Sequence, residues 1–112
     1  SPATVRRRAG RLARRLRGLG VAAEVLAGRS TVGGGSLPGE TLPTWLVALR
    51  VPSAGALARR LRLGQPAVVG RIEEDRYLID LRTVLPEQEG RLFAALEQAL
   101  SDLQGVTIRA PG

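Results

Sequence analysis

Residues 30–44 read Ser-Thr-Val-Gly-Gly-Gly-Ser-Leu-Pro-Gly-Glu-Thr-Leu-Pro-Thr, and an apolar run from Trp45 to Leu49 follows at once. The three consecutive glycines carry no side chains, so another backbone or a ligand can approach them closely. Pro38 and Pro43 restrict the backbone on the far side of the segment. Loops of this length inside a compact domain are usually functional or disordered, so residues 30–44 are the first place to look for function.

Helix and strand patterns flank this segment on both sides. Apolar residues recur at helical spacing between residues 2 and 19, and the nearly continuous apolar run after Thr44 is typical of a central strand. Ser53 is a good N-cap for a helix that Gly64 would close. The expected helices span residues 2–19, 54–63 and 86–105, and the expected strands span residues 21–27, 44–51, 67–73 and 76–82.

The order helix, strand, strand, helix, strand, strand, helix predicts an α+β fold. The crossover through the middle helix should place the second and third strands parallel. The last two strands form a hairpin around Glu74-Asp75, and the antiparallel fourth strand can then lie between the second and third. We therefore expect a four-stranded, mainly antiparallel sheet in the order 1-2-4-3, with helices on one face. Residues 1–105 would form one domain, and residues 106–112 a tail.

The composition limits the chemistry that this chain can perform. Among 112 residues, all seventeen basic residues are arginine, and lysine, histidine, cysteine and methionine are absent. There is no lysine for a Schiff base, no histidine base and no thiol nucleophile. Metal sites built from histidine or cysteine are likewise excluded. We therefore expect no catalytic residue and no metal site, and the missing initiator methionine suggests a fragment of a larger protein.

Positive charge is concentrated at the start of the chain. Residues 1–20 hold seven arginines and no acid, while the other ten arginines are balanced by ten acids, which leaves a net charge of +7. We expect the seven arginines on the arc opposite the apolar stripe of the first helix. This face is either a solvated helix exterior or a surface that contacts nucleic-acid phosphates. A membrane-surface helix is a weaker alternative, because the core needs its apolar stripe.

Two motifs resemble one known family. The glycine-rich stretch at 30–44 is the first, and the second comprises Pro66-Ala-Val-Val-Gly-Arg-Ile72 followed by Leu78-Ile-Asp-Leu-Arg-Thr-Val-Leu-Pro86. Together they resemble the C-terminal domain of bacterial selenocysteine synthase, an L-seryl-tRNA(Sec) selenium transferase of the fold-type I pyridoxal-phosphate enzymes. With the flanking helices, the resemblance covers nearly the whole chain and agrees with the expected fold.

The resemblance implies the setting in which this chain works. The parent would be a cytoplasmic homo-oligomer, with no membrane partner, that converts seryl-tRNA(Sec) to selenocysteyl-tRNA(Sec). It would use pyridoxal phosphate and selenophosphate. The cofactor would be held by the large domain of the same protein and not by this fragment, which is not catalytic alone.

The resemblance implies that Arg71 and Asp80 lie close to substrate or cofactor. They should share the open sheet face and, if Ile72 pairs with Tyr77, form a charge-assisted contact. Arginines of fold-type I small domains commonly grip a substrate carboxylate or phosphate. Here the seryl carboxyl is esterified, so a carbonyl, phosphate or selenophosphate contact fits better. The alternative is a surface ion pair, and Arg82 is a second candidate.

The glycine-rich segment is a separate candidate. The backbone N–H groups of Gly33, Gly34, Gly35 and Ser36 could form a phosphate nest near the substrate or cofactor. The alternative is that the glycines only permit a turn. The segment is not a Walker A loop, because no lysine follows it.

The charged helix supplies candidate tRNA contacts, and other functions stay open. The candidate contacts are Arg7, Arg8, Arg11, Arg14 and Arg15. One alternative function is the small domain of a related pyridoxal enzyme that acts on a small amino or sugar acid. Another is a basic RNA-binding module that binds tRNA unaided, although the scarcity of aromatic residues counts against it. A third is a structural domain that caps an oligomer.

Overall fold

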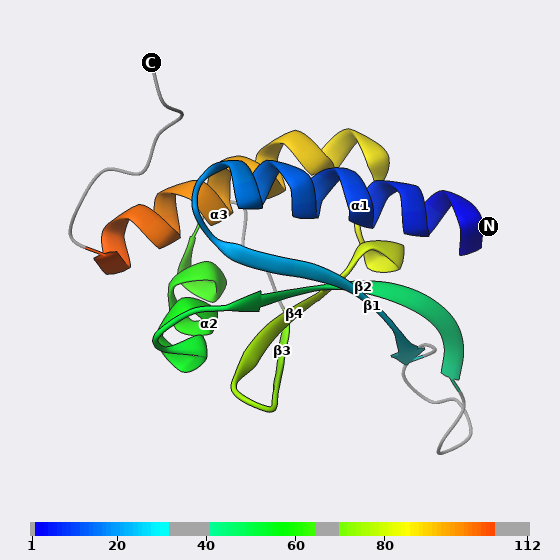
Figure 1. Cartoon of the computed structure of the whole chain (residues 1–112), viewed down its shortest axis with the longest axis horizontal. Coiled ribbons are helices and arrows are strands. Elements are labelled where there is room, and N and C mark those ends of the chain that lie inside the picture. Colours follow the sequence, from blue (N-terminus) through cyan, green and yellow to red (C-terminus); the bar gives the residue numbers. More distant parts are fainter. Residues whose placement is uncertain (1, 32–40, 65–69, 105–112) are drawn as a thin grey trace.

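The computed structural model of the chain describes residues 2–31, 41–64 and 70–104. Three α-helices, four strands and two short 3-10 helices follow one another along the chain (Figure 1). In chain order they are α1 (Pro2–Gly18), β1 (Ala22–Thr31), β2 (Thr41–Arg50), α2 (Ala54–Leu63), β3 (Arg71–Glu73), β4 (Arg76–Asp80), η1 (Leu81–Thr83), η2 (Pro86–Gln88) and α3 (Glu89–Gln104).

The four strands form one sheet in the order β1-β2-β4-β3, which confirms the predicted topology. β2 pairs antiparallel with β1 along its length and with β4 at Leu46–Leu49, so it is the central strand expected from its apolar run. In the hairpin, Ile72 lies opposite Tyr77. This is the pairing on which the predicted contact between Arg71 and Asp80 was conditional.

The glycine-rich segment is shorter as a loop than the sequence suggested. β1 continues to Thr31 and β2 begins at Thr41, so only residues 32–40 lie between them. Pro43 is paired with Arg29 of β1, but β4 does not reach this end of β2. A proline that lacks its N–H is tolerated where a strand has one neighbour, which explains why it does not interrupt β2.

The hairpin turn has a positive-φ backbone conformation that glutamate and aspartate rarely adopt. Glu74 and Asp75 have φ angles of 52° and 63°. Positive φ at both central residues is what a primed two-residue turn requires, although asparagine or glycine fills these positions more readily. The backbone pairing of β3 with β4 therefore outweighs the local preference of these two acidic residues.

All three α-helices pack on one face of the sheet, as predicted (Figure 1). Val47 and Leu49 of β2 meet Tyr77 and Ile79 of β4 on this face, and all four are at most 1% exposed. Full burial of each such side chain stabilises the fold by about 1.5–3 kcal/mol. The fully buried leucines that the helices and η1 add to this core are Leu16, Leu57, Leu61, Leu81, Leu96 and Leu100.

Capping groups end the helices where the sequence predicted. The Ser53 hydroxyl accepts a hydrogen bond from the Ala56 N–H at 3.1 Å, and the Gly64 N–H donates to the Leu61 carbonyl at 3.3 Å. After α1 the chain turns at Gly20, whose φ of 89° favours glycine. At the C-terminal end of α3, Leu103 is 39% exposed and does not belong to the core.

A buried ion pair joins the first and last helices. Arg8 of α1 is 8% exposed, and its guanidinium donates to the Glu89 carboxylate of α3 and to the Val84 carbonyl. The prediction that all seven arginines lie on the solvent arc is therefore wrong for Arg8. Position 8 is three residues after Val5 and four before Leu12, so it lies on the apolar stripe of the helix. The acid in the first turn of α3 then neutralises a charge that would otherwise be buried alone.

Replacing Glu89 with alanine should lower the free energy of unfolding by about 2–4 kcal/mol, because the Arg8 guanidinium stays largely buried without its counter-charge. Urea unfolding followed by circular dichroism measures this change. The matched control Glu87→Ala removes an exposed acid two residues away and should change stability by less than about 0.5 kcal/mol. The double variant Arg8→Met/Glu89→Leu should recover most of the loss, and equal effects of the two single variants would contradict the assignment.

The only tyrosine of the chain lies in the core. Tyr77 has no exposed surface, and a Cβ atom built on Gly70 would lie 2.7 Å from its hydroxyl oxygen. Within the described residues, this hydroxyl makes no well-aligned hydrogen bond. Burial raises the pKa of Tyr77 to about 12, and the opposing effects of the Gly70 backbone and the positive charge of Arg62 are smaller.

The phenol of Tyr77 should therefore titrate near pH 12 in the folded chain and near its ordinary pKa of 10.0 in the unfolded chain. The unfolded state loses this proton first, so stability is unaffected below about pH 10 and decreases as the pH rises from 10 to 12. Phenolate absorbance measures the titration without interference from other tyrosines. A folded-state midpoint near 10 would show that the hydroxyl is open to water.

Candidate functional site

Polar side chains gather at one end of the sheet face that the helices leave uncovered, which we call the open face. The pairing registers place Gly28, Thr44, Arg71 and Asp80 on this face. Gly28, Thr44 and Asp80 lie toward the end where β1 finishes and β2 begins, whereas Arg71 lies opposite Leu78, farther along the sheet. The predicted sharing of one face by Arg71 and Asp80 is thus confirmed. The candidates Gly33, Gly34, Gly35 and Ser36 lie outside the described residues.

Asp80 is held by its own neighbours. Its Oδ1 accepts a hydrogen bond from the Thr44 hydroxyl at 2.7 Å and another from the Arg82 N–H at 3.0 Å. The first bond ties β4 to β2, and the second caps η1. Thr44 is 3% exposed, so its hydroxyl has little access to water and depends on this carboxylate. Asp80 therefore fixes the shape of this end of the sheet.

The expected ion pair between Arg71 and Asp80 is wrong. Among the described residues, Arg71 pairs instead with Glu73, whose Oε2 lies 3.1 Å from the Arg71 Nε. In the register Arg71 lies opposite Leu78, so Asp80 is two residues further along β4, whereas Glu73 follows on the same face of the same strand. Both side chains are part-exposed, at 40% and 56%, so the contact itself adds little stability.

The Arg71 guanidinium extends across the open face toward β1. A Cβ atom built on Gly28 would lie 3.7 Å from the Arg71 Nη2 and 2.5 Å from the Leu46 Cδ1. The absence of a side chain at position 28 therefore makes room for the Leu46 side chain, and the Arg71 guanidinium lies beside it at an ordinary contact distance. Arg71 remains open to solvent on this face, where it can meet an anionic or carbonyl group.

Arg82, the second candidate, has a structural contact. Its Nη2 donates to the Pro43 carbonyl at 2.9 Å and so links η1 to the start of β2. Arg76 lies at the other end of the open face, where its guanidinium pairs with Glu24 at 3.4 Å. Of Arg71, Arg76 and Arg82, Arg71 is therefore the best placed to bind a ligand.

The basic side of α1 forms a second candidate surface, which we call the α1 groove. It is a hollow of about 600 Å³ between α1 and the first two strands, lined by Arg6, Arg7, Gly10, Arg11, Arg14, Val25 and Trp45. Arg6 lies over the Trp45 ring, 4.7 Å from its centroid. Three of the five candidate tRNA contacts, Arg7, Arg11 and Arg14, line the groove together.

The other arginines of α1 are occupied elsewhere. Arg15 stacks on Phe93 at 3.9 Å from the ring centroid, and Arg17 donates to the Ala23 carbonyl at 2.8 Å. Arg8 is buried against Glu89 and is not placed to meet a ligand. The apolar stripe of α1 is itself part of the core, so this helix has no free apolar face for a membrane surface. None of the described helices is long and apolar enough to cross a bilayer.

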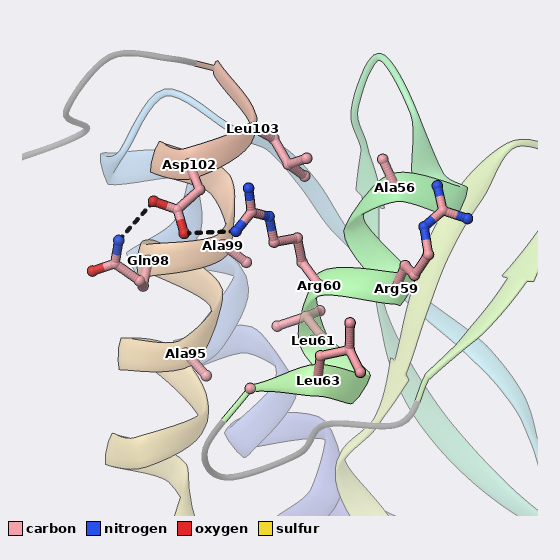
Figure 2. Close-up of a pocket in the computed structure, with 11 residues that line it drawn as sticks. Ala56, Arg59, Arg60, Leu61, Leu63, Ala95, Gln98, Ala99, Asp102 and Leu103 are labelled. Carbon is pink, nitrogen blue, oxygen red and sulfur yellow. Dashed lines mark hydrogen bonds and ion pairs between the residues drawn. The ribbon is translucent and has the colours of Figure 1, made fainter.

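Another hollow, of about 480 Å³, lies between α2 and α3 (Figure 2). Arg60 of α2 reaches across it to Asp102 of α3 at 3.4 Å, and Gln98 donates to the same carboxylate at 2.8 Å. At its edges Leu63 and Leu103 are 81% and 39% exposed. The sequence did not reveal this hollow, because both leucines continue the apolar spacing of their helices. Its apolar lining suits contact with protein better than chemistry on a small molecule.

The composition of the chain excludes several kinds of catalytic group and metal ligand. No group of three acidic residues among the described residues could hold a metal ion, and the whole chain lacks histidine, cysteine and lysine. Without lysine the chain cannot hold pyridoxal phosphate as a Schiff base, so its residues do not fit that cofactor as its primary site. Any chemistry of this kind needs groups from elsewhere.

The chain is similar to proteins of one kind. The sequence profile of the family described as SelA, L-seryl-tRNA selenium transferase, matches residues 1–85. Proteins named L-seryl-tRNA(Sec) selenium transferase are 41% identical over 100 residues in Aquifex aeolicus and 45% identical over 105 residues in Nitratidesulfovibrio vulgaris. These matches cover 87% and 89% of this chain but 22% of each relative. The chain therefore spans about a fifth of the length of these curated relatives.

Replacing Thr44 with valine should lower the free energy of unfolding by about 1–2 kcal/mol, because the Asp80 carboxylate loses a hydrogen bond in a part-buried position. The shape of the side chain is conserved, so packing changes little. Thr44→Ser keeps the hydroxyl and is the matched control. Equal stability of the valine and serine variants in urea unfolding would show that this hydrogen bond does not support the open face.

Proposed function

This chain belongs to the L-seryl-tRNA selenium transferase family, and from that premise we propose that it is the C-terminal domain of a selenocysteine synthase. The parent protein would convert seryl-tRNA(Sec) to selenocysteyl-tRNA(Sec) in the cytoplasm, with selenophosphate as selenium donor. The observation that carries this proposal is the family match over residues 1–85, combined with the 22% of the relatives' length that the chain covers. The names of the relatives favour seryl-tRNA over a small amino acid or sugar acid as substrate.

The composition of this chain indicates which part of the parent protein would hold the cofactor. Pyridoxal phosphate would supply the chemistry that eliminates the seryl hydroxyl, and the large domain of the same protein would hold it, because this chain has no lysine. The domain would contribute binding and orientation from its open face. It would act together with that large domain, in a homo-oligomer, and not as an independent catalyst.

Arg71 would be the residue of this domain that meets the reacting end of the substrate. Its side chain is 40% exposed on the open face, and its Nη2 reaches the neighbourhood of Gly28 on β1. Glu73 restrains it at the Nε, which leaves its other nitrogens available for two parallel hydrogen bonds. A phosphate, a selenophosphate or the carbonyl oxygen of the seryl ester can accept such bonds.

In the full-length protein, Arg71→Ala should lower kcat/KM for selenocysteyl-tRNA formation on the order of 100-fold, because a donor aimed at the substrate is lost. Radiolabelled seryl-tRNA and selenophosphate provide the assay. Glu73→Gln removes the neighbouring charge but leaves the guanidinium, and should retain most of the activity. Full activity of Arg71→Ala would overturn the role of Arg71 but not the family function.

The proposed function itself is tested by the substrate. The full-length protein should convert seryl-tRNA(Sec) and should not turn over free serine or small sugar acids, and the 112-residue chain alone should do neither. Turnover of a small amino acid in preference to seryl-tRNA would overturn the proposal, as would turnover by the isolated chain.

A further inference from the structure

We infer that the α1 groove binds the phosphate backbone of RNA, with Arg7, Arg11 and Arg14 as the contacting side chains. The inference rests on the proposed function, because that function requires a tRNA and so identifies the RNA. Of the five arginines that the sequence suggested as tRNA contacts, only these three line the groove. It also specifies the kind of contact, which is to phosphates and not to bases.

The first support is that the groove holds more positive charge than the described carboxylates neutralise. Three arginines on other surfaces have acidic partners within 3.5 Å: Arg60 with Asp102, Arg71 with Glu73, and Arg76 with Glu24. In the part of the chain that the structure describes, no such pair involves Arg7 or Arg14. The carboxylate nearest to Arg11 is Glu89 at 3.8 Å, which already neutralises Arg8.

The second support is the spacing of the three side chains. Positions 7, 11 and 14 lie on one face of α1, separated by about 6 Å and 4.5 Å along the helix axis. Gly10 lies between them without a side chain, and a Cβ atom built there would lie 3.6 Å from the Arg14 Nη1. The Arg14 guanidinium therefore lies beside Gly10, and the three side chains form a row along which the evenly spaced phosphates of one strand can lie.

The third support is that the groove has no free aromatic face for base stacking. Proteins that bind single-stranded bases provide free aromatic faces for stacking. Trp45 is the only aromatic residue of the groove, and Arg6 already stacks on it. The described lining of the groove therefore supplies positive charge but no free aromatic ring on which a base could stack. Contacts of this kind bind RNA without regard to sequence and depend strongly on salt.

The test measures tRNA binding by the full-length protein at a series of salt concentrations. The variant Arg7→Gln/Arg11→Gln/Arg14→Gln should reduce the slope of log K against log salt by about 2–3, because three phosphate contacts are lost. Its affinity at low salt should fall by 10-fold to 100-fold. These arginines are not buried, so the thermal unfolding midpoint should stay within a few degrees of the wild type.

A matched control removes the same charge elsewhere. Arg59→Gln/Arg62→Gln/Arg91→Gln changes three exposed arginines of α2 and α3 and should leave the slope within about 0.5 of the wild type. If both triple variants reduce the slope equally, the effect is one of net charge and the inference fails. If vesicles containing phosphatidylserine bind the wild type and not the α1 variant, while the tRNA slopes are equal, the groove is a lipid site and the inference also fails.

The outcomes separate this inference from the proposed function. A protein that makes selenocysteyl-tRNA but whose α1 variant keeps the wild-type slope overturns the α1 groove alone. A protein that binds tRNA through the groove but does not convert seryl-tRNA overturns the proposed function and leaves the groove standing.

Discussion

The packing of three helices against a single face of the sheet is the constraint on which the rest of the molecule depends. Val47 and Leu49 point into that core, and their neighbours on β2, Leu46 and Ala48, point to the open face. The open face is not fully solvated, because Leu46, Ala48 and Leu78 are at most 4% exposed. Polar groups lie around this apolar patch, in the ion pairs of Arg71 and Arg76 and in the hydrogen bond between Thr44 and Asp80.

The same constraint divides the arginines of α1 into structural and available ones. A helix that packs along a sheet has an apolar side, a flank on either edge and a solvent side. Arg8 falls on the apolar side and is neutralised by Glu89, whereas Arg6 and Arg15 lie on the flanks and cover Trp45 and Phe93. The total charge of the helix thus overstates what a ligand can meet. The arginines available in the groove are therefore identified by what each arginine contacts, and not by the number of arginines in the helix.

The sequence was sufficient to predict the strand order, but not to predict which charged side chains pair with one another. Apolar periodicity and one hairpin determined the order β1-β2-β4-β3, because few arrangements satisfy both. The partner of Arg71 was mispredicted because cross-strand and same-strand neighbours are equally close, and only the direction of the guanidinium decides between them. Arg8 was misplaced because charge suggested solvent, although its spacing from Val5 and Leu12 already indicated the core. The roles of Arg71 and of residues 33–36 stay predictions.

The two proposed binding surfaces are linked through the central strand. Thr44 and Trp45 are consecutive residues of β2, and successive side chains of a strand point to opposite faces. Thr44 supports the open face near Arg71, while Trp45 forms part of the α1 groove on the helical side. A substrate that touches both surfaces of one domain must therefore pass around an edge of the sheet. A tRNA is long enough to do so. A small amino acid could occupy only one of the two surfaces, so a domain that uses both is suited to a macromolecular substrate.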